Sequence, residues 1–161
     1  MKAASLIDIK KSLARLEPGD LLETCLRLAR FKKENKELLT YLLFMCDDEQ
    51  GFADYLCGEI DEHFALTPNA HKKTLRKIIR WMDKCLRFTQ VKETAAQVRI
   101  HFCRALDASE TPYLRNKVTT NMFARQLKKV RAIVEKFHED IQCEYLPEIE
   151  VLSQRLPQSI I

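Results

Sequence analysis

The chain has only three glycines among its 161 residues, and this shortage limits the folds open to it more than any other feature. Sheets joined by tight hairpins need residues that accept positive φ, and glycine does so at no steric cost. Residues that favour helices, such as Leu, Lys, Arg, Glu and Ala, are abundant instead. No segment keeps a period-two alternation of apolar and polar residues. The sequence therefore predicts an all-α protein.

Apolar residues recur every three or four positions along most of the chain, and turn signals divide this pattern into seven or eight helices. The expected helices cover residues 5–16, 21–33, 36–46, 48–65, 71–88, 91–106 and 113–140, followed by a short last helix that Pro147 starts or kinks. Helix 36–46 has almost no polar face, so we expect it to be central. We expect these helices to pack as hairpins.

Three helix starts carry capping signals. Asp20 with Glu23 has the spacing of a capping box, which would start the helix at 21–33. The pairs Thr67–Pro68 and Thr111–Pro112 each place a capping residue before a proline, which suits the first helical position.

The length predicts a single domain spanning residues 1–161, and a chain this long buries roughly 70% of its unfolded surface. Within it, residues 1–106 would form helical hairpins, and residues 113–156 a long helix with a C-terminal helix. The clearest loop, DASETP at 107–112, separates these parts.

A faint repeat at an offset of fifty residues adds to this prediction. LEPGDLLETCLRLARF at 16–31 aligns with LTPNAHKKTLRKIIRW at 66–81, with Leu, Pro, Thr and Arg identical at four positions. With its hairpin rhythm and its L-x-P starts at Leu16 and Leu66, the chain resembles HEAT-like helical-repeat proteins over about residues 5–106. It also resembles small, uncharacterised all-helical bacterial proteins of that kind. This resemblance implies either a short solenoid or an irregular bundle with a surface that holds partners, and it carries over no functional residue.

The segment from His71 to Phe88 contains seven Lys or Arg and a single Asp. On a helical wheel the cations fall in one arc of roughly 140°, and apolar residues fill the opposite arc. The candidate surface consists of Lys72, Lys73, Arg76, Lys77, Arg80, Lys84 and Arg87, with Trp81 at its border.

Three interpretations of this basic face compete. It could be a solvated face that pairs with the acidic block at 47–65, which has seven carboxylates and no Lys or Arg. Such pairs contribute about 0–1 kcal/mol each when exposed, so they would fix register more than stability. It could instead bind nucleic-acid phosphates, with Trp81 as a stacking platform for an unpaired base. A membrane-surface helix is the third interpretation, and it would need an apolar face that the core should occupy.

Few chemistries find support in the sequence. The glycines are isolated, so there is no phosphate-binding loop or dinucleotide fingerprint. Glu135-x-x-His138 has no second copy, and we expect no metal and no cofactor. Glu59 and His63 could form an acid–base pair, but a partly buried, satisfied histidine is the simpler interpretation. We therefore predict a non-enzymatic protein with no catalytic residue.

The cysteines and the hydropathy pattern indicate where in the cell the protein is expected. Six cysteines sit among apolar helical residues without a CxxC pair, which indicates reduced core residues of a cytoplasmic protein. The longest apolar run has nine residues, Leu38 to Cys46, against the ~20 needed for a membrane span, so we expect no membrane partner.

Partner predictions follow from these surfaces. The first hypothesis is a protein–protein interaction or scaffold module, and the alternative is a nucleic-acid-binding protein that uses helix 71–88. A heptad stripe through Phe123, Leu127, Val130, Val134, Phe137 and Ile141 could form a homodimer, or other helices of the same chain could cover it.

Overall fold

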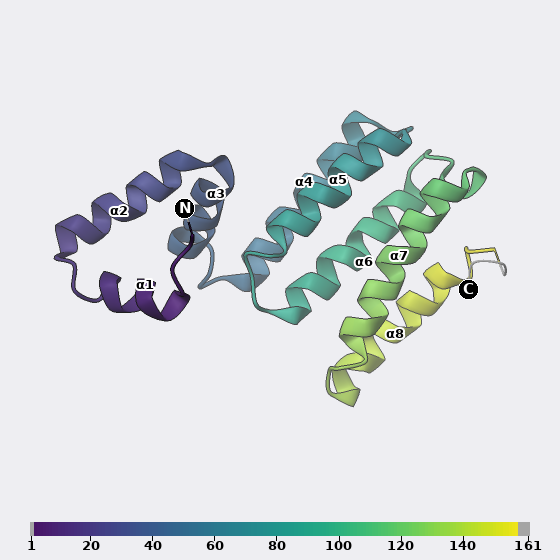
Figure 1. Cartoon of the computed structure of the whole chain (residues 1–161). Helices are drawn as coiled ribbons and strands as arrows, with labels where there is room; N and C mark the ends of the chain where they lie inside the picture. The colour runs from purple at the N-terminus through teal and green to yellow at the C-terminus, as the bar shows by residue number, and fades with distance from the viewer. Residues whose placement is uncertain (1, 158–161) are drawn as a thin grey trace. The chain divides into compact units, whose positions relative to one another are not determined.

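The structure is a computed structural model that describes residues 2–157, and within them it contains eight α-helices, a short 3-10 helix and no strand. This confirms the all-α prediction. The elements are α1 (Leu6–Leu13), α2 (Pro18–Phe31), α3 (Lys33–Phe44), α4 (Glu49–Leu66), α5 (Lys72–Cys85), α6 (Lys92–Ala108), η1 (Tyr113–Arg115), α7 (Lys117–Val134) and α8 (Glu139–Ser153), and Figure 1 labels the α-helices.

The chain divides into two compact units, residues 1–44 and residues 45–161. The division falls at the end of α3, whereas the sequence suggested the loop at 107–112. We call these parts the first unit and the second unit. Among residues 2–157, twenty-four of the twenty-five buried apolar residues belong to the second unit, so the two units differ sharply in how well they are packed.

The first unit consists of α1, α2 and α3. A single residue, Lys32, separates α2 from α3, and these two helices pack against each other. Tyr41 is its one buried residue among those described. The prediction that helix 36–46 is central is therefore wrong, because three short helices are too few to cover an apolar helix on all sides.

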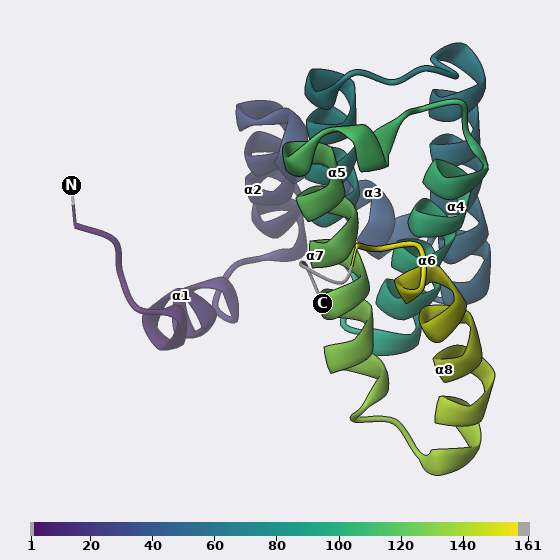
Figure 2. The same cartoon turned by 90° about the vertical axis from the view of Figure 1, so that its right-hand side faces the viewer.

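The second unit has its helices in two layers. α6 packs against α4, α7 and α8, while α5 contacts α4 and α7. Figure 2 shows α5 and α7 on one side of this unit and α4, α6 and α8 on the other. The amphipathic helices meet along their apolar faces, so each layer has an outer surface made of its polar residues.

Burial in the core follows the predicted stripes. Leu75, Ile78 and Met82 of α5 are at most 1% exposed, as its amphipathic pattern predicted. The heptad stripe of α7 is also buried within the chain: Phe123 and Val130 are fully buried, and Val130 belongs to a cluster with residues of α6 and α8. The stripe is thus covered by helices of its own chain, which was the second of the two alternatives.

Several predicted boundaries are wrong. The expected helix 113–140 is interrupted, because α7 ends at Val134 and α8 begins at Glu139. Pro147 neither starts nor ends a helix and lies inside α8. α2 begins at Pro18 with Glu17 as its N-cap, so the expected capping box at Asp20 does not form.

The two proline-associated starts at 67 and 111 also differ from expectation. Thr67 ends α4 as its C-cap, and α5 begins only at Lys72. Thr111 instead joins two loops, because its hydroxyl accepts from the Ala70 amide at 2.9 Å and donates to the Pro68 carbonyl at 3.2 Å. These hydrogen bonds join the loop before α5 to the loop between α6 and η1.

Candidate functional site

The two layers of the second unit carry opposite charge. α5 and α7 together contain eleven Lys or Arg and one carboxylate, Asp83. α4 and α8 contain five carboxylates each and no Lys or Arg, and α6 contributes three cations and two carboxylates. We call the α5/α7 surface the basic layer and the α4/α6/α8 surface the acidic layer.

Most cations of the predicted surface have no acidic partner. Among residues 2–157 no ion pair forms at Lys72, Lys73, Arg76, Lys77, Arg80 or Arg87. For these six residues, the expected pairing with the acidic block at 47–65 does not occur. The reason lies in the packing, since acidic groups of α4 turn toward α6 and the segment before it: Asp61 contacts His101 at 2.7 Å, and Glu49 accepts hydrogen bonds from Thr89 and Thr94.

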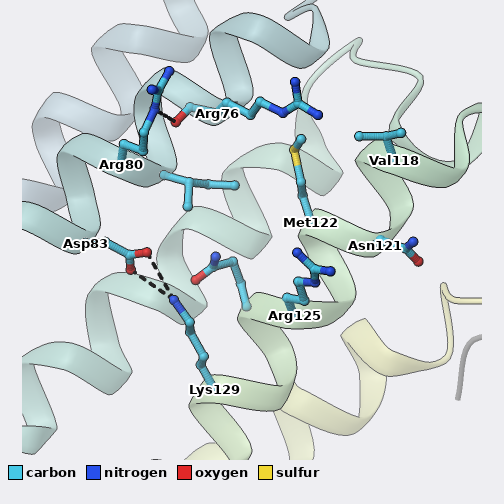
Figure 3. A pocket seen from close by; sticks show the side chains of 10 residues that line it. Arg76, Arg80, Asp83, Val118, Asn121, Met122, Arg125 and Lys129 are labelled. Atoms are coloured by element: carbon cyan, nitrogen blue, oxygen red, sulfur yellow. Dashed lines mark hydrogen bonds and ion pairs between the residues drawn. The ribbon is translucent and has the colours of Figure 1, made fainter.

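A groove of about 770 Å³ lies between α5 and α7. Arg76 and Arg80 reach it from α5, and Arg125 and Lys129 reach it from α7. Figure 3 shows the Arg76 side chain extending toward α7, where Met122 and Arg125 face the same hollow. Arg80 is oriented by its own helix, because its Nε donates to the Arg76 carbonyl at 3.3 Å. Like Arg76 and Arg80, Arg125 forms no ion pair with any described residue.

One carboxylate lines this groove, and its charge is already offset. Asp83 accepts from Arg99 Nη1 at 2.7 Å and from Lys129 Nζ at 3.0 Å. Partial burial alone would raise the pKa of Asp83, but Arg99 and Lys129 outweigh it, so this pKa lies below its ordinary value. Arg99 is only 11% exposed and also donates to Gln126 at 2.6 Å, so α6 supplies the counter-charge from beneath the groove.

The basic layer is hollowed on both sides of this groove. A hollow of about 430 Å³ at the starts of α5 and α7 is lined in part by Lys72 and Lys73. A third, of about 660 Å³, lies between α7 and the end of α8 and includes Arg125, Lys128 and Arg131. Because Arg125 lines two of the three hollows, cations follow one another along the layer instead of forming a single point site.

The sequence prediction missed the cations of α7: Lys117, Arg125, Lys128, Lys129 and Arg131. A signal was present, since residues 117–134 contain five Lys or Arg and no carboxylate. That α7 lies beside α5 follows from tertiary packing, which the sequence pattern does not show.

Trp81 does not take part in this groove. Its indole is half-buried and meets the imidazole of His63 edge-on, with 5.8 Å between ring centroids. No hydrogen bond joins Glu59 to His63 among the described residues, so the acid–base alternative finds no contact to support it. His63 thus packs against Trp81 where α4 meets α5.

In comparisons with known proteins, no family model, curated protein or solved structure matches the chain. Within residues 2–157, no helix is both long and apolar enough to cross a membrane. In the same residues, no three His, Cys, Asp or Glu side chains gather in a way that could hold a metal ion.

Proposed function

We propose that this protein binds nucleic acid through its basic layer and has no enzymatic activity of its own. The observation that carries the proposal is the groove between α5 and α7, which is lined by Arg76, Arg80 and Arg125, none of them in an ion pair with a described residue. Guanidinium groups present several fixed donors that match phosphate oxygens. Binding a phosphate chain there would release the counterions condensed on it, which supplies most of the affinity of sequence-independent binders.

The lining of the groove supports contact with the sugar–phosphate backbone and not with bases. Its apolar members are Ile79, Val118 and Met122, and no aromatic side chain lines it. Proteins that hold single strands commonly stack bases on aromatic rings. Since Trp81 packs on His63 instead, the groove offers no aromatic ring on which a base could stack. Duplex DNA or RNA, which has the higher charge density, is the ligand that we expect to bind more tightly.

The acidic layer supports one-sided binding. With five carboxylates on each of α4 and α8, the opposite side of the second unit repels phosphates. A nucleic acid would therefore approach along α5 and α7 and meet the eleven Lys and Arg side chains of these two helices. This arrangement explains how a chain with a net charge of only +4 can still present a strongly basic surface.

Fluorescence anisotropy of labelled duplex and single-stranded oligonucleotides tests the proposal. The wild-type protein should bind both, and the duplex more tightly. The combined substitution Arg76→Gln, Arg80→Gln and Arg125→Gln should weaken binding by about 100-fold or more. The matched control Lys10→Gln, Lys11→Gln and Arg15→Gln removes the same charge from the first unit, and it should leave the affinity within about threefold.

Two outcomes would overturn the proposal. One is the absence of oligonucleotide binding at low salt, above all if the protein then self-associates in a salt-dependent way, because the basic layer would be pairing with the acidic layer of another copy. The other is tighter binding of single strands with quenching of Trp81 fluorescence, which would replace backbone contact by base stacking.

A protein partner is the second candidate function. The observation that favours it lies in the first unit, where large apolar residues are exposed along all three helices. The stacked hairpins of the second unit also support the HEAT-like resemblance as part of this proposal, since such layers commonly present binding surfaces. A cytoplasmic location fits the six cysteines, all of which are free thiols.

A further inference from the structure

One face of α2 combines an exposed aromatic ring with cations. Thr24, Arg27, Leu28 and Phe31 stand at positions i, i+3, i+4 and i+7 and therefore share one side of the helix. Together with Arg30 they line an open hollow of about 530 Å³. We call these five residues the Phe31 face.

Two apolar side chains form the centre of the Phe31 face. Phe31 is 76% exposed, and Leu28, one turn before it, is 57% exposed. Phe31 does not line the groove of about 270 Å³ between α2 and α3, so the packing of these two helices does not use its ring. An uncovered ring is unfavourable in water, and a ligand that covers it gains free energy.

The cations beside this ring have no acidic partner. The segment RLARFKK, which carries the ring, contains four Lys or Arg and no carboxylate. Lys33 forms an ion pair with Glu37, one turn along α3, at 3.8 Å. Arg27, Arg30 and Lys32 form no ion pair with any residue that the structure describes. These three cations can therefore meet an anion that approaches the ring.

The stability of the helices does not account for these charges. Glu23 stands four residues before Arg27, the spacing at which an ion pair supports a helix, yet none forms between them, and Glu23 does not line the hollow. Arg30, in the last turn of α2, is favoured by the helix dipole. Lys33 and Lys36 lie in the first turn of α3, where the dipole disfavours cations. An anionic ligand would offset this unfavourable charge.

We propose that the Phe31 face binds a single-stranded nucleic acid, with one unpaired base stacked on Phe31 and the adjacent phosphates held by Arg27 and Arg30. Proteins that hold single strands combine cations, which follow the backbone, with exposed aromatic rings, on which bases stack. Leu28 extends the apolar platform beyond the ring. The basic layer has no aromatic lining and holds a duplex backbone, so the first unit would add the contact to bases that the second unit lacks.

The two parts of the Phe31 face select this ligand by their chemistry. The ring needs a flat apolar group, and the guanidinium groups beside it need an anion. Each nucleotide of a single strand carries both, a base and a phosphate, whereas a duplex keeps its bases within the stack. The choice of a nucleic acid over an acidic protein also rests on the proposed function, since the basic layer of the same chain is assigned to phosphates there.

Anisotropy with a labelled single-stranded oligothymidylate of about ten nucleotides tests the proposal. The titrations use the full chain with the triple Gln substitution in the groove between α5 and α7, so that the basic layer contributes little. In this background Phe31→Leu, which keeps an apolar side chain but removes the ring, should weaken binding about 10-fold. The matched control is Phe44→Leu, because Phe44 is 78% exposed but is followed in the sequence by Asp47 and Asp48. It should leave the affinity within about threefold.

An abasic oligomer of the same length separates base stacking from charge. It should bind about 10-fold more weakly than the oligothymidylate, and Phe31→Leu should weaken its binding no further. Arg27→Gln with Arg30→Gln should weaken the binding of both oligomers and make the slope of log Kobs against log salt shallower by about 1.4, or about 0.7 for each contact with a single strand. The control Lys10→Gln with Lys11→Gln removes the same charge from α1 and should leave the slope unchanged.

Three results would overturn this assignment: no binding of oligothymidylate at low salt, binding that survives Phe31→Leu, or an equal loss from Phe44→Leu. Equal affinity for the abasic oligomer would also overturn it, because the cations would then hold any polyanion, an acidic protein included. Duplex affinity of the wild type and of the triple Gln variant, measured in parallel, tests the basic layer alone. The proposed function and this inference can therefore fail separately.

Discussion

Asp83 and Arg99 form an ion pair with 2.7 Å between Asp83 Oδ1 and Arg99 Nη1, and this pair ties the basic layer to α6. Arg99 is almost buried, and its Nε is a buried donor without a hydrogen-bond partner. A buried guanidinium is stabilised by a nearby carboxylate and is costly without one. Asp83 thus neutralises the Arg99 guanidinium beneath the groove, although Asp83 itself lies on a surface that we propose to bind phosphates.

Removing the charge of Asp83 should lower the stability of the protein and raise its affinity for a duplex. Asp83→Asn should lower the free energy of unfolding by about 1–3 kcal/mol, because Arg99 loses its counter-charge. The same change frees Lys129, so duplex affinity should rise and the salt dependence should steepen by about one phosphate contact. Denaturation and anisotropy measure the two effects. The control Glu62→Gln removes an equal charge from an exposed position on α4. If it acts like Asp83→Asn, the effect is one of net charge alone.

The lowered pKa of Asp83 predicts a specific dependence of stability on pH. A carboxyl whose pKa is lower in the folded state contributes stability above its unfolded pKa, and loses it as the pH falls through the folded pKa. The difference in unfolding free energy between the wild type and Asp83→Asn should therefore be constant near neutral pH and shrink below about pH 4. Urea denaturation at several pH values measures this difference. A difference in unfolding free energy that widens as the pH falls would contradict the pairing of Asp83 with Arg99 and Lys129.

The contrast between the two units predicts how apolar substitutions affect stability. Phe123→Ala should cost about 3–5 kcal/mol, because Phe123 is fully buried in the second unit. Phe31→Ala should cost less than about 0.5 kcal/mol, since that ring is 76% exposed in the first unit. Chemical denaturation of the two variants compares these losses. Equal losses would show that the first unit has a core of its own.

Thiol reactivity tests the burial of the cysteines. Burial raises the pKa of the Cys57 thiol to about 11, with Asp61 and Asp54 adding to the effect, so its reaction with a disulfide reagent should be slow at neutral pH and accelerate with pH. Cys103 is buried and its pKa is raised further, so it should react only on unfolding. Cys143 is exposed and should react first. Rapid labelling of Cys103 in the native protein would contradict the packing of α6.

Local periodicity predicted most of the fold. The helix expected at 71–88 lies at Lys72–Cys85, because its charged and apolar arcs are strongly separated and leave a single way to bury it. The predicted central position of α3 failed because apolar content does not show how many neighbours a helix will have. The end of α7 also escaped prediction, since the apolar stripe continues through the turn at Phe137 into α8.

The candidate site was only half predictable. The cations of α5 follow from one amphipathic segment, whereas the groove also needs Arg125 and Lys129 from a helix about fifty residues away. The expected pairing of this face with the acidic segment 47–65 rested on opposite charge along neighbouring stretches of chain. In the structure that segment turns acidic groups toward α6, as the contact of Asp61 with His101 shows. Charge patterns identify faces, but packing decides which faces meet.

The salt dependence of duplex binding tests the central claim most directly. Anisotropy titrations between about 50 and 200 mM salt give the slope of log Kobs against log salt, which is about −0.9 for each phosphate contact. We predict a slope of about −4 to −6 for the wild type and a slope shallower by about 2–3 when Arg76, Arg80 and Arg125 are replaced by Gln. A flat slope, or the same slope in both proteins, would contradict the claim that the basic layer holds a phosphate backbone.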